Sequence, residues 1–164
     1  MLAFPNTTGP VFTLNEELLR TGFLAAAQSP RRRIILPVHR SQDAFVQRML
    51  NFLQPGTYIQ PHLHPLEHAS ETIQVLRGAI GFLVFDEEGA VLSRHLLRAD
   101  SCALIDIEPN VWHGFVTLEP DTVVLEVKRG PYDPDNDKVF AVWCPKEGEP
   151  GTKALLAQWR AAFD

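Results

Sequence analysis

Three histidines and one glutamate are spaced so that they could hold a metal ion together. His62 and His64 are separated by one residue, and side chains alternate between the two faces of a strand, so both imidazoles point the same way. Glu71 opens the next predicted strand, and a short loop between antiparallel neighbours returns its carboxylate to the histidines. His113 is distant in sequence, but a barrel brings remote strands together and can supply the third imidazole.

The chemistry that these residue types support is the binding of a transition metal. Neutral imidazole is a ligand of borderline softness, and one carboxylate adds a hard oxygen that partly cancels the charge of a divalent ion. Four protein ligands leave open positions on a five- or six-coordinate ion, as a catalytic site requires. We therefore expect one divalent transition metal ion (Fe, Zn, Ni or Mn) on His62, His64, Glu71 and His113.

A further acidic residue, Glu126, interrupts an apolar stretch, Val123 to Val127. Because burial of an unpaired charge is costly, its side chain faces either solvent or a polar cavity. If it faces a central cavity, Glu126 is a candidate catalytic acid or base. The sequence leaves both options open.

Four other residues are candidates for the lining of a substrate pocket: His39, Arg48, Tyr58 and Tyr132. Strand alternation alone does not fix which of them point inward, since a shift of one residue reverses every side chain. His39 either donates to a bound ligand or ends a surface strand. The pocket lining is thus an expectation for the structure to test.

The elements that must position these residues are short strands between two helices. Leu14, Leu18 and Phe23 recur at helical spacing, so we expect a helix over residues 14–27, with Thr13 and Glu16 as its capping box. A second helix is expected over residues 152–163. Between them, a β-rich core over residues 34–128 contains strands expected at 44–51, 58–62, 71–77, 79–85, 91–97, 102–107, 114–118 and 122–128.

Length and charge limit the remaining possibilities. The 164 residues suit a single domain over 1–164, with residues 1–12 as an irregular arm. The formal net charge of −5 argues against nucleic acid as a partner, and we interpret the basic run Arg31–Arg33 as a solvated loop. No apolar stretch has the length of a membrane span, and no signal peptide is evident. We therefore expect a cytoplasmic protein with two reduced cysteines.

The stretch around the histidines resembles the first motif of the cupins, G-x5-H-x-H-x(3,4)-E-x6-G. Gly56, His62, His64, Glu71 and Gly78 match it, although six residues separate His64 from Glu71 instead of three or four. The segment 109–113 resembles the second motif, one residue short. The resemblance implies an all-β fold, the double-stranded β-helix or jelly-roll barrel of the cupins, here with short N-terminal and C-terminal helices.

Nearly the whole chain is similar to the WbuC-like cupin metalloproteins, which are often found with bacterial surface-polysaccharide genes. The matching segments include residues 29–33, 47–51, 61–64, 76–78 and 126–132. The resemblance implies a small-molecule metalloenzyme, of the isomerase, epimerase or oxygenase type, that acts on a polar, sugar-derived substrate. The alternative is a non-catalytic module that binds a sugar or carboxylate through the metal. A homodimer is also open, because small cupins pair through barrel edges.

Overall fold

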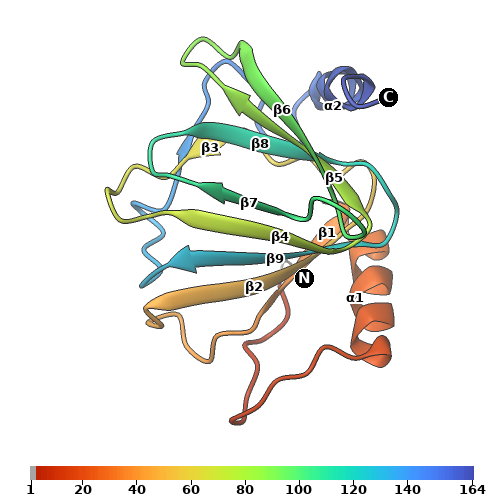
Figure 1. Cartoon of the computed structure of the whole chain (residues 1–164), viewed down its shortest axis with the longest axis vertical. Helices are drawn as coiled ribbons and strands as arrows, with labels where there is room; N and C mark the ends of the chain where they lie inside the picture. The colour runs from red at the N-terminus through yellow and green to blue at the C-terminus, as the bar shows by residue number, and fades with distance from the viewer. Residues whose placement is uncertain (1–2) are drawn as a thin grey trace.

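The computed structural model describes residues 3–164 as two antiparallel sheets flanked by two helices (Figure 1). The expected single domain and irregular arm both begin at Met1, and Met1 and Leu2 lie outside the described residues. The elements are α1 (Glu16–Gln28), β1 (Arg33–Pro37), β2 (Val46–Leu53), β3 (His62–Leu63), β4 (Glu71–Arg77), β5 (Ala79–Phe85), β6 (Val91–Arg98), β7 (Leu104–Ile107), β8 (Trp112–Thr117), β9 (Thr122–Arg129), β10 (Val139–Phe140) and α2 (Thr152–Ala161).

Each sheet has five strands. The first has the order β1-β2-β9-β4-β7 and the second the order β10-β3-β8-β5-β6. Consecutive strands pair in β1–β2 and β5–β6, but other neighbours are far apart in sequence, as with β2 beside β9, which is how a jelly roll brings remote segments together. The two sheets face each other, and the side chains between them form the interior of the barrel (Figure 1).

Strand alternation divides the side chains between the interior and two outer layers. The interior contains an apolar cluster that includes Leu53, Phe82 and Val124. The next residues along the strands, such as Phe52 and Val123, point outward and pack against α1, which covers the outer face of the first sheet. On the outer face of the second sheet, Trp159 of α2 packs over β5 and β8.

The expected helices and strands agree with the structure except at a few ends. The bounds of β4 and β5 are as predicted, and α1 and α2 lie within two residues of their expected positions. The proposed capping box is wrong, because Asn15 caps α1: its side chain accepts from the Leu18 N–H at 2.9 Å. The strand expected at 58–62 is also wrong, since only His62 and Leu63 pair as β3.

Two strands, β1 and β10, were not predicted. The expected solvated loop at Arg31–Arg33 is corrected by the structure: Arg33 opens β1 and is only 5% exposed. Both Arg31 and Arg33 form ion pairs with Glu147, at 3.0 and 2.8 Å. The C-terminal loop is thereby held against β1, and a distant acid in sequence compensates the buried guanidinium.

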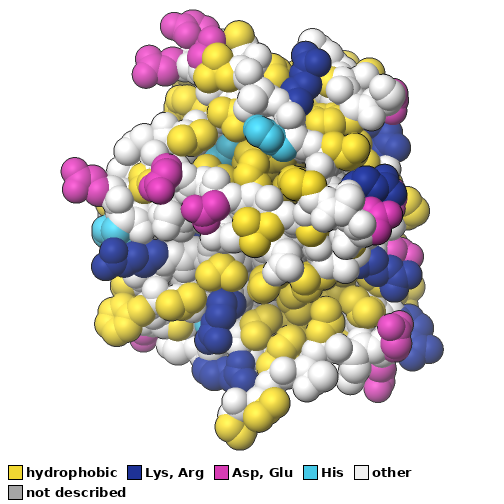
Figure 2. Space-filling model, viewed as in Figure 1, with side chains coloured by type: hydrophobic (Ala, Val, Ile, Leu, Met, Phe, Trp, Pro, Cys, Tyr) yellow, Lys and Arg dark blue, Asp and Glu magenta, His cyan; other side chains and the backbone are white. Residues whose placement is uncertain are grey.

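On the face shown in Figure 2, acidic and basic side chains are interspersed around hydrophobic ones. Among the large apolar residues exposed elsewhere on the strands are Leu92 and Leu96 on β6, an edge strand of the second sheet. Within residues 3–164, neither helix is long and apolar enough to cross a membrane.

Candidate metal centre

The four predicted ligands come from three strands that meet at one end of the barrel. His62 pairs with His113 across β3 and β8, and Glu71 is the first residue of β4. His64 follows β3, where its backbone oxygen accepts from Asn110 N at 2.9 Å. Pro61 precedes this segment; because proline donates no ladder hydrogen bond, it suits the start of so short a strand.

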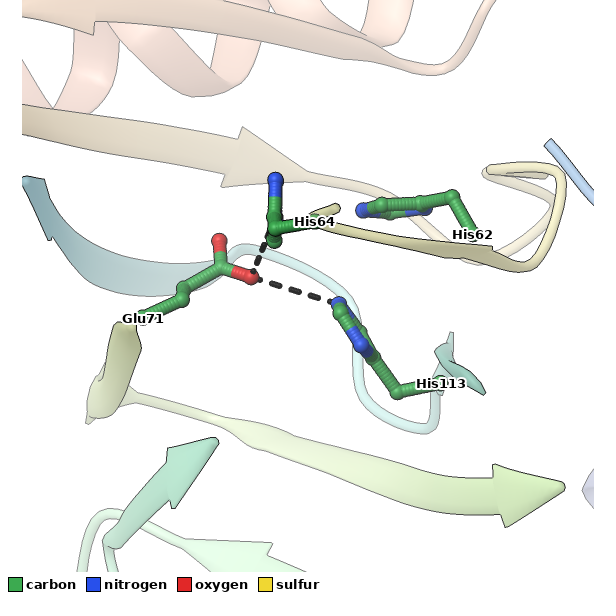
Figure 3. Close-up of side chains that lie close together, drawn as sticks. All are labelled: His62, His64, Glu71 and His113. Carbon is green, nitrogen blue, oxygen red and sulfur yellow. Dashed lines mark hydrogen bonds and ion pairs between the residues drawn. The ribbon is translucent and has the colours of Figure 1, made fainter. Parts of the chain in front are cut away.

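The side chains of these four residues converge in the interior. One ligand atom from each, an imidazole nitrogen or a carboxylate oxygen, lies within 4.8 Å of the others. All four residues are buried, with exposed fractions of 2 to 5%. In Figure 3 the His64 and His113 rings both approach the same carboxylate oxygen of Glu71, at 3.1 and 3.2 Å, and His62 lies beside His64.

A backbone carbonyl orients each of the three imidazoles. His62 Nδ1 lies 3.1 Å from Gln60 O, His64 Nδ1 lies 2.6 Å from Asp137 O, and His113 Nδ1 lies 2.9 Å from Val111 O. A carbonyl oxygen only accepts, so each Nδ1 carries the hydrogen, and in the neutral ring Nε2 presents its lone pair.

Burial and nearby charge determine the ionisation of the cluster. Burial, together with the positive charge of Lys138, holds the pKa of His62 well below its usual range, so this ring is neutral at neutral pH. Burial alone would raise the pKa of Glu71, but the contacts with His113 and His64 outweigh it and lower that pKa well below the usual range. The site therefore holds a carboxylate and neutral imidazole, the forms that ligate metals.

The donor set fits a divalent metal ion. The buried Nε2 of His113 has no hydrogen-bond partner, since the Glu71 oxygen 3.2 Å away is outside hydrogen-bonding geometry. Neutral imidazole nitrogens that face a carboxylate would leave buried lone pairs opposed to one another, which is unfavourable. A cation among them satisfies every lone pair at once, and the carbonyls on the Nδ1 atoms are the usual outer support of metal-bound histidines.

A cavity of about 430 Å³ lies next to this cluster. Its walls include Met49 and Asn51 of β2 and Glu126 and Lys128 of β9, and the strand register places Glu126 beside Ile73 and Lys128 beside Glu71. The cavity thus opens beside the metal-ligand cluster.

Glu126 faces the cavity, which decides the question that the sequence left open. Its Oε2 accepts a hydrogen bond from Asn51 Nδ2 at 3.1 Å. Burial and the neighbouring Glu71 carboxylate raise the pKa of Glu126 to about 7, against the opposing effect of Lys138. A carboxyl group so placed can accept or donate a proton near neutral pH.

Two basic residues of the cavity wall differ in how their charge is compensated. Lys128, which is 5% exposed, forms an ion pair with Asp137. The backbone oxygen of the same Asp137 holds His64, so one residue orients a ligand and neutralises a buried cation. Lys138, the next residue, also lines the cavity, and no ion pair of Lys138 is found within residues 3–164.

The structure separates the four expected pocket residues into two pairs. His39 and Tyr132 line the cavity. Arg48 does not, because it points to the exposed side of β2 while its neighbours Gln47 and Met49 point inward. Tyr58 is also elsewhere: it packs against Trp159 and donates from its hydroxyl to Pro145 O at 2.6 Å.

Sequence reasoning missed several polar residues of the cavity, among them Asn51, Lys128, Asp137 and Lys138. Lys128 could have been found, because it shares a strand face with Glu126 two residues away. The same argument applies to Asn51, which lies two residues from Met49 on the inward face of β2. Asp137 and Lys138 lie in a segment without strand pattern, and no local signal indicates that this loop returns to the histidines.

Comparison with known proteins agrees with this architecture. A search of curated proteins finds no significant match. Among solved structures, KdgF from a Halomonas species is similar with a TM-score of 0.51 and 20% identity, over 66% of this chain and 87% of that one. CapF of Staphylococcus aureus, a capsular polysaccharide assembling protein, has a TM-score of 0.51 and 20% identity over 57% of this chain. The match spans only 26% of the CapF chain.

A third similar structure is the dTDP-4-dehydrorhamnose 3,5-epimerase of Bacillus anthracis, solved with TDP and pyrophosphate bound. It has 26% identity and a TM-score of 0.51, over 66% of each chain. These neighbours have the cupin fold, so the predicted fold class is confirmed.

A family model for a domain of unknown function, DUF6016, matches residues 14–97, which is 84 of the 164 residues. The matched segment extends from α1 through β6 and contains His62, His64 and Glu71. By this match, and with the cupin fold established by its structural neighbours, the chain belongs to the DUF6016 family.

Proposed function

We propose that His62, His64, Glu71 and His113 bind one divalent transition metal ion, and that the protein is a metalloenzyme acting on a small polar molecule. The observation that carries the proposal is the arrangement of the three imidazoles. A backbone carbonyl holds the Nδ1 atom of each ring, and two of the rings approach one oxygen of Glu71 through Nε2.

When bound, the ion would supply Lewis-acid polarisation of a carbonyl or hydroxyl group, or one-electron chemistry if it is iron. The cavity lies beside the cluster, because its wall residue Lys128 pairs with Glu71 in the strand register, and in this proposal it is the route by which a small molecule reaches the metal. The chain's own contribution is to exclude bulk water, fix the ligands in orientation and line the approach with polar groups.

Glu126 is our candidate catalytic acid or base in this scheme. It faces the cavity, and the hydrogen bond from Asn51 to Oε2 fixes the orientation of the carboxyl group while leaving Oε1 for a substrate proton. Isomerisation requires a proton to be removed and returned, which one positioned carboxyl group can do. Epimerisation requires the proton to return from the opposite face of the substrate, so it would need a second proton donor beside Glu126.

A sugar-derived substrate linked to surface-polysaccharide synthesis is part of the same proposal. It is supported by the resemblance to the WbuC-like cupins and by the similarity to CapF, a capsular polysaccharide assembling protein, and to the dTDP-4-dehydrorhamnose 3,5-epimerase. Fold similarity alone is an associational argument, so the substrate must be tested through the site. A homodimer is likewise proposed, through the β6 edge with exposed Leu92 and Leu96, and light scattering tests it.

The decisive experiment is elemental analysis of protein purified without chelator or metal-affinity resin. We expect about one equivalent of a single transition metal in the wild type and almost none in the His62→Ala, His64→Ala double variant. His95→Ala is the matched control, because His95 is exposed on β6, away from the four ligands, and its ring hydrogen-bonds with Ser93 at 3.0 Å. A wild type that neither contains nor takes up metal would contradict the proposal.

A second candidate function is a binding module without turnover. It is favoured by one observation: Asp137 and Glu147 of the cavity wall are both engaged in ion pairs, so Glu126 is the one carboxyl group free for proton transfer among the described lining residues. The Glu126→Gln variant distinguishes the two functions. Loss of turnover with retained metal supports the enzyme, and unchanged ligand binding with no turnover in either protein supports the module.

A further inference from the structure

Two polar groups of the cavity wall have no direct partner among residues 3–164, and they indicate what the cavity binds. The first is the Lys138 ammonium group. Arg31 and Arg33 are paired with Glu147, and Lys128 is paired with Asp137, whereas Lys138 has no carboxylate within ion-pair distance in residues 3–164. Lys138 is half-buried, and Glu71 and Glu126 act on its charge only from beyond ion-pair distance, so a ligand carboxylate would supply the direct ion pair that this cation lacks.

The second group is Nε2 of His39. The ring is 1% exposed and Nε2 has no hydrogen-bond partner. Along β1 and just beyond it, Arg33, Ile35, Pro37 and His39 alternate onto one face, and all four line the cavity. The unpaired nitrogen therefore belongs to a side chain on the cavity wall.

The hydrogen bonds between His39 and the backbone of Arg48 identify Nε2 as a donor. His39 Nδ1 lies between two backbone groups of Arg48, with the N–H at 3.0 Å and the carbonyl oxygen at 2.9 Å. That oxygen differs from the carbonyls at the metal-site histidines, because both of its lone pairs already accept, from the N–H groups of Val38 and His39. A buried backbone N–H needs an acceptor, so Nδ1 uses its lone pair and the hydrogen of the neutral ring lies on Nε2. An acceptor oxygen from a ligand would satisfy this N–H.

Two amide side chains offer the complementary groups. Gln47 donates through Nε2 to Gln42 O and Ala44 O, and Gln60 donates through Nε2 to Ala141 O. Both residues line the cavity, and both use their NH₂ groups on the protein, which leaves the amide oxygens as acceptors for hydroxyl groups.

We propose that the cavity binds a small hydroxy carboxylate whose carboxylate group pairs with Lys138, while His39 donates to one of its oxygens and the two glutamines accept from its hydroxyls. This inference names the ligand class of the proposed function and rests on it, because the same molecule would reach the metal cluster. The charge balance favours a monoanion over a phosphate dianion, since the charged lining residues leave one cation in excess: Arg31, Arg33, Lys128 and Lys138 against Glu126, Asp137 and Glu147.

The test is a titration of metal-loaded protein by calorimetry with matched acids and neutral analogues. The probes are gluconate against glucitol and glycolate against ethylene glycol, so that each pair differs in the carboxylate. We expect an acid to bind and its neutral partner to bind at least tenfold more weakly, because only the acid forms a charge-assisted pair with the Lys138 ammonium group. Lys138→Met should lose the same factor, and Lys138→Arg should restore most of it.

Lys153→Gln is the control for general charge, since Lys153 is exposed on α2. Failure of every acid to bind the metal-loaded wild type, equal binding of acid and neutral analogue, or equal binding by Lys138→Met would overturn the ligand class. Elemental analysis of the same samples distinguishes failure of the proposed ligand class from failure of the proposed metal centre. Loaded metal with no acid preference rejects only the hydroxy carboxylate, whereas protein that takes up no metal rejects the metal centre itself.

Discussion

The interior of the barrel differs between its two ends, although the same strands form both. On β9, Val124 lies in the apolar cluster, whereas Glu126 and Lys128 line the cavity. On β2, Leu53 is apolar and fully buried, and Asn51, two residues earlier on the same face, binds Glu126. We call the end with Asn51, Glu126 and Lys128 the polar end, and the end with Leu53 and Val124 the apolar end. In Figure 1 the polar end is where β4 begins and β9 ends.

The contrast separates what stabilises the fold from what the fold is used for. Each large apolar side chain buried at the apolar end contributes about 1.5–3 kcal/mol. The polar end buries carboxylates, imidazoles and a lysine. The free-energy cost of desolvating these groups offsets much of the free energy gained when they pair. We conclude that the apolar end maintains the barrel and that the polar end is maintained by it. The predictions that follow test this division.

The largest expected effect is metal-dependent stability, and it should depend on the polar end alone. A ligand that binds only the folded state at a free concentration 1,000 times its Kd stabilises by about 4 kcal/mol. We expect this gain in the wild type on adding metal after chelation, and its loss in His113→Ala. Urea unfolding with and without metal measures it. An equal gain in the variant would show that the metal binds elsewhere.

The matching change at the apolar end is Leu53→Ala. Leu53 is 0% exposed in the apolar cluster, and such a truncation costs about 2–5 kcal/mol because it removes buried surface and leaves a cavity. We expect this loss in urea unfolding of the metal-free protein. The gain on adding metal should stay at its wild-type size. A reduced gain would mean that the two ends are coupled.

How far the sequence predicts each end follows from the same contrast. Strands β4 and β5 were placed with their bounds because the strand pattern is interrupted at Gly78. Gly78 has a φ of +75°, and a Cβ at this position would lie 2.3 Å from Thr122 Oγ1, so the turn requires glycine. The convergence of His62, His64, Glu71 and His113 was also predicted, since strand parity and motif spacing are local signals.

The parts that were not predicted depend on contacts between distant segments. From the sequence, Arg33 is interpreted as a surface residue, because its ion-pair partner Glu147 lies 114 positions later. Likewise, β10 has two residues and exists only because it pairs with β3. Arg48 and Tyr58 were grouped with His39 and Tyr132 because inward and outward positions differ by a single residue of register.

A smaller effect is expected for Asn51→Ala, which tests the polar end without touching a ligand. The change removes the hydrogen bond from Asn51 to Glu126 and leaves a buried acceptor, for a cost of about 1–3 kcal/mol. We expect metal content to stay near one equivalent, because Asn51 is not among the four ligands. Elemental analysis and urea unfolding measure the two quantities, and loss of metal would make Asn51 part of the centre.

The smallest expected effect concerns the ion pairs of Glu147 with Arg31 and Arg33 at the cavity wall. Burial raises the pKa of Glu147, but the hydrogen bonds from Arg31 and Arg33 outweigh it, so that its net pKa is below the ordinary value of 4.5. A carboxyl group with a lowered folded pKa contributes stability that is complete above about pH 4.5 and is lost as the pH falls through the folded value.

The difference in unfolding free energy between wild type and Glu147→Gln should therefore shrink as the pH falls below 4.5. Because Glu147 is partly exposed, we expect no more than about 1 kcal/mol. Urea unfolding of metal-free protein between pH 3 and 7 measures it, and removing the metal keeps the titration of its ligands from adding a metal-linked term. A difference that instead grew toward acid pH would mean that Glu147 is protonated in the folded state, and that the guanidinium groups of Arg31 and Arg33 are balanced by another acid.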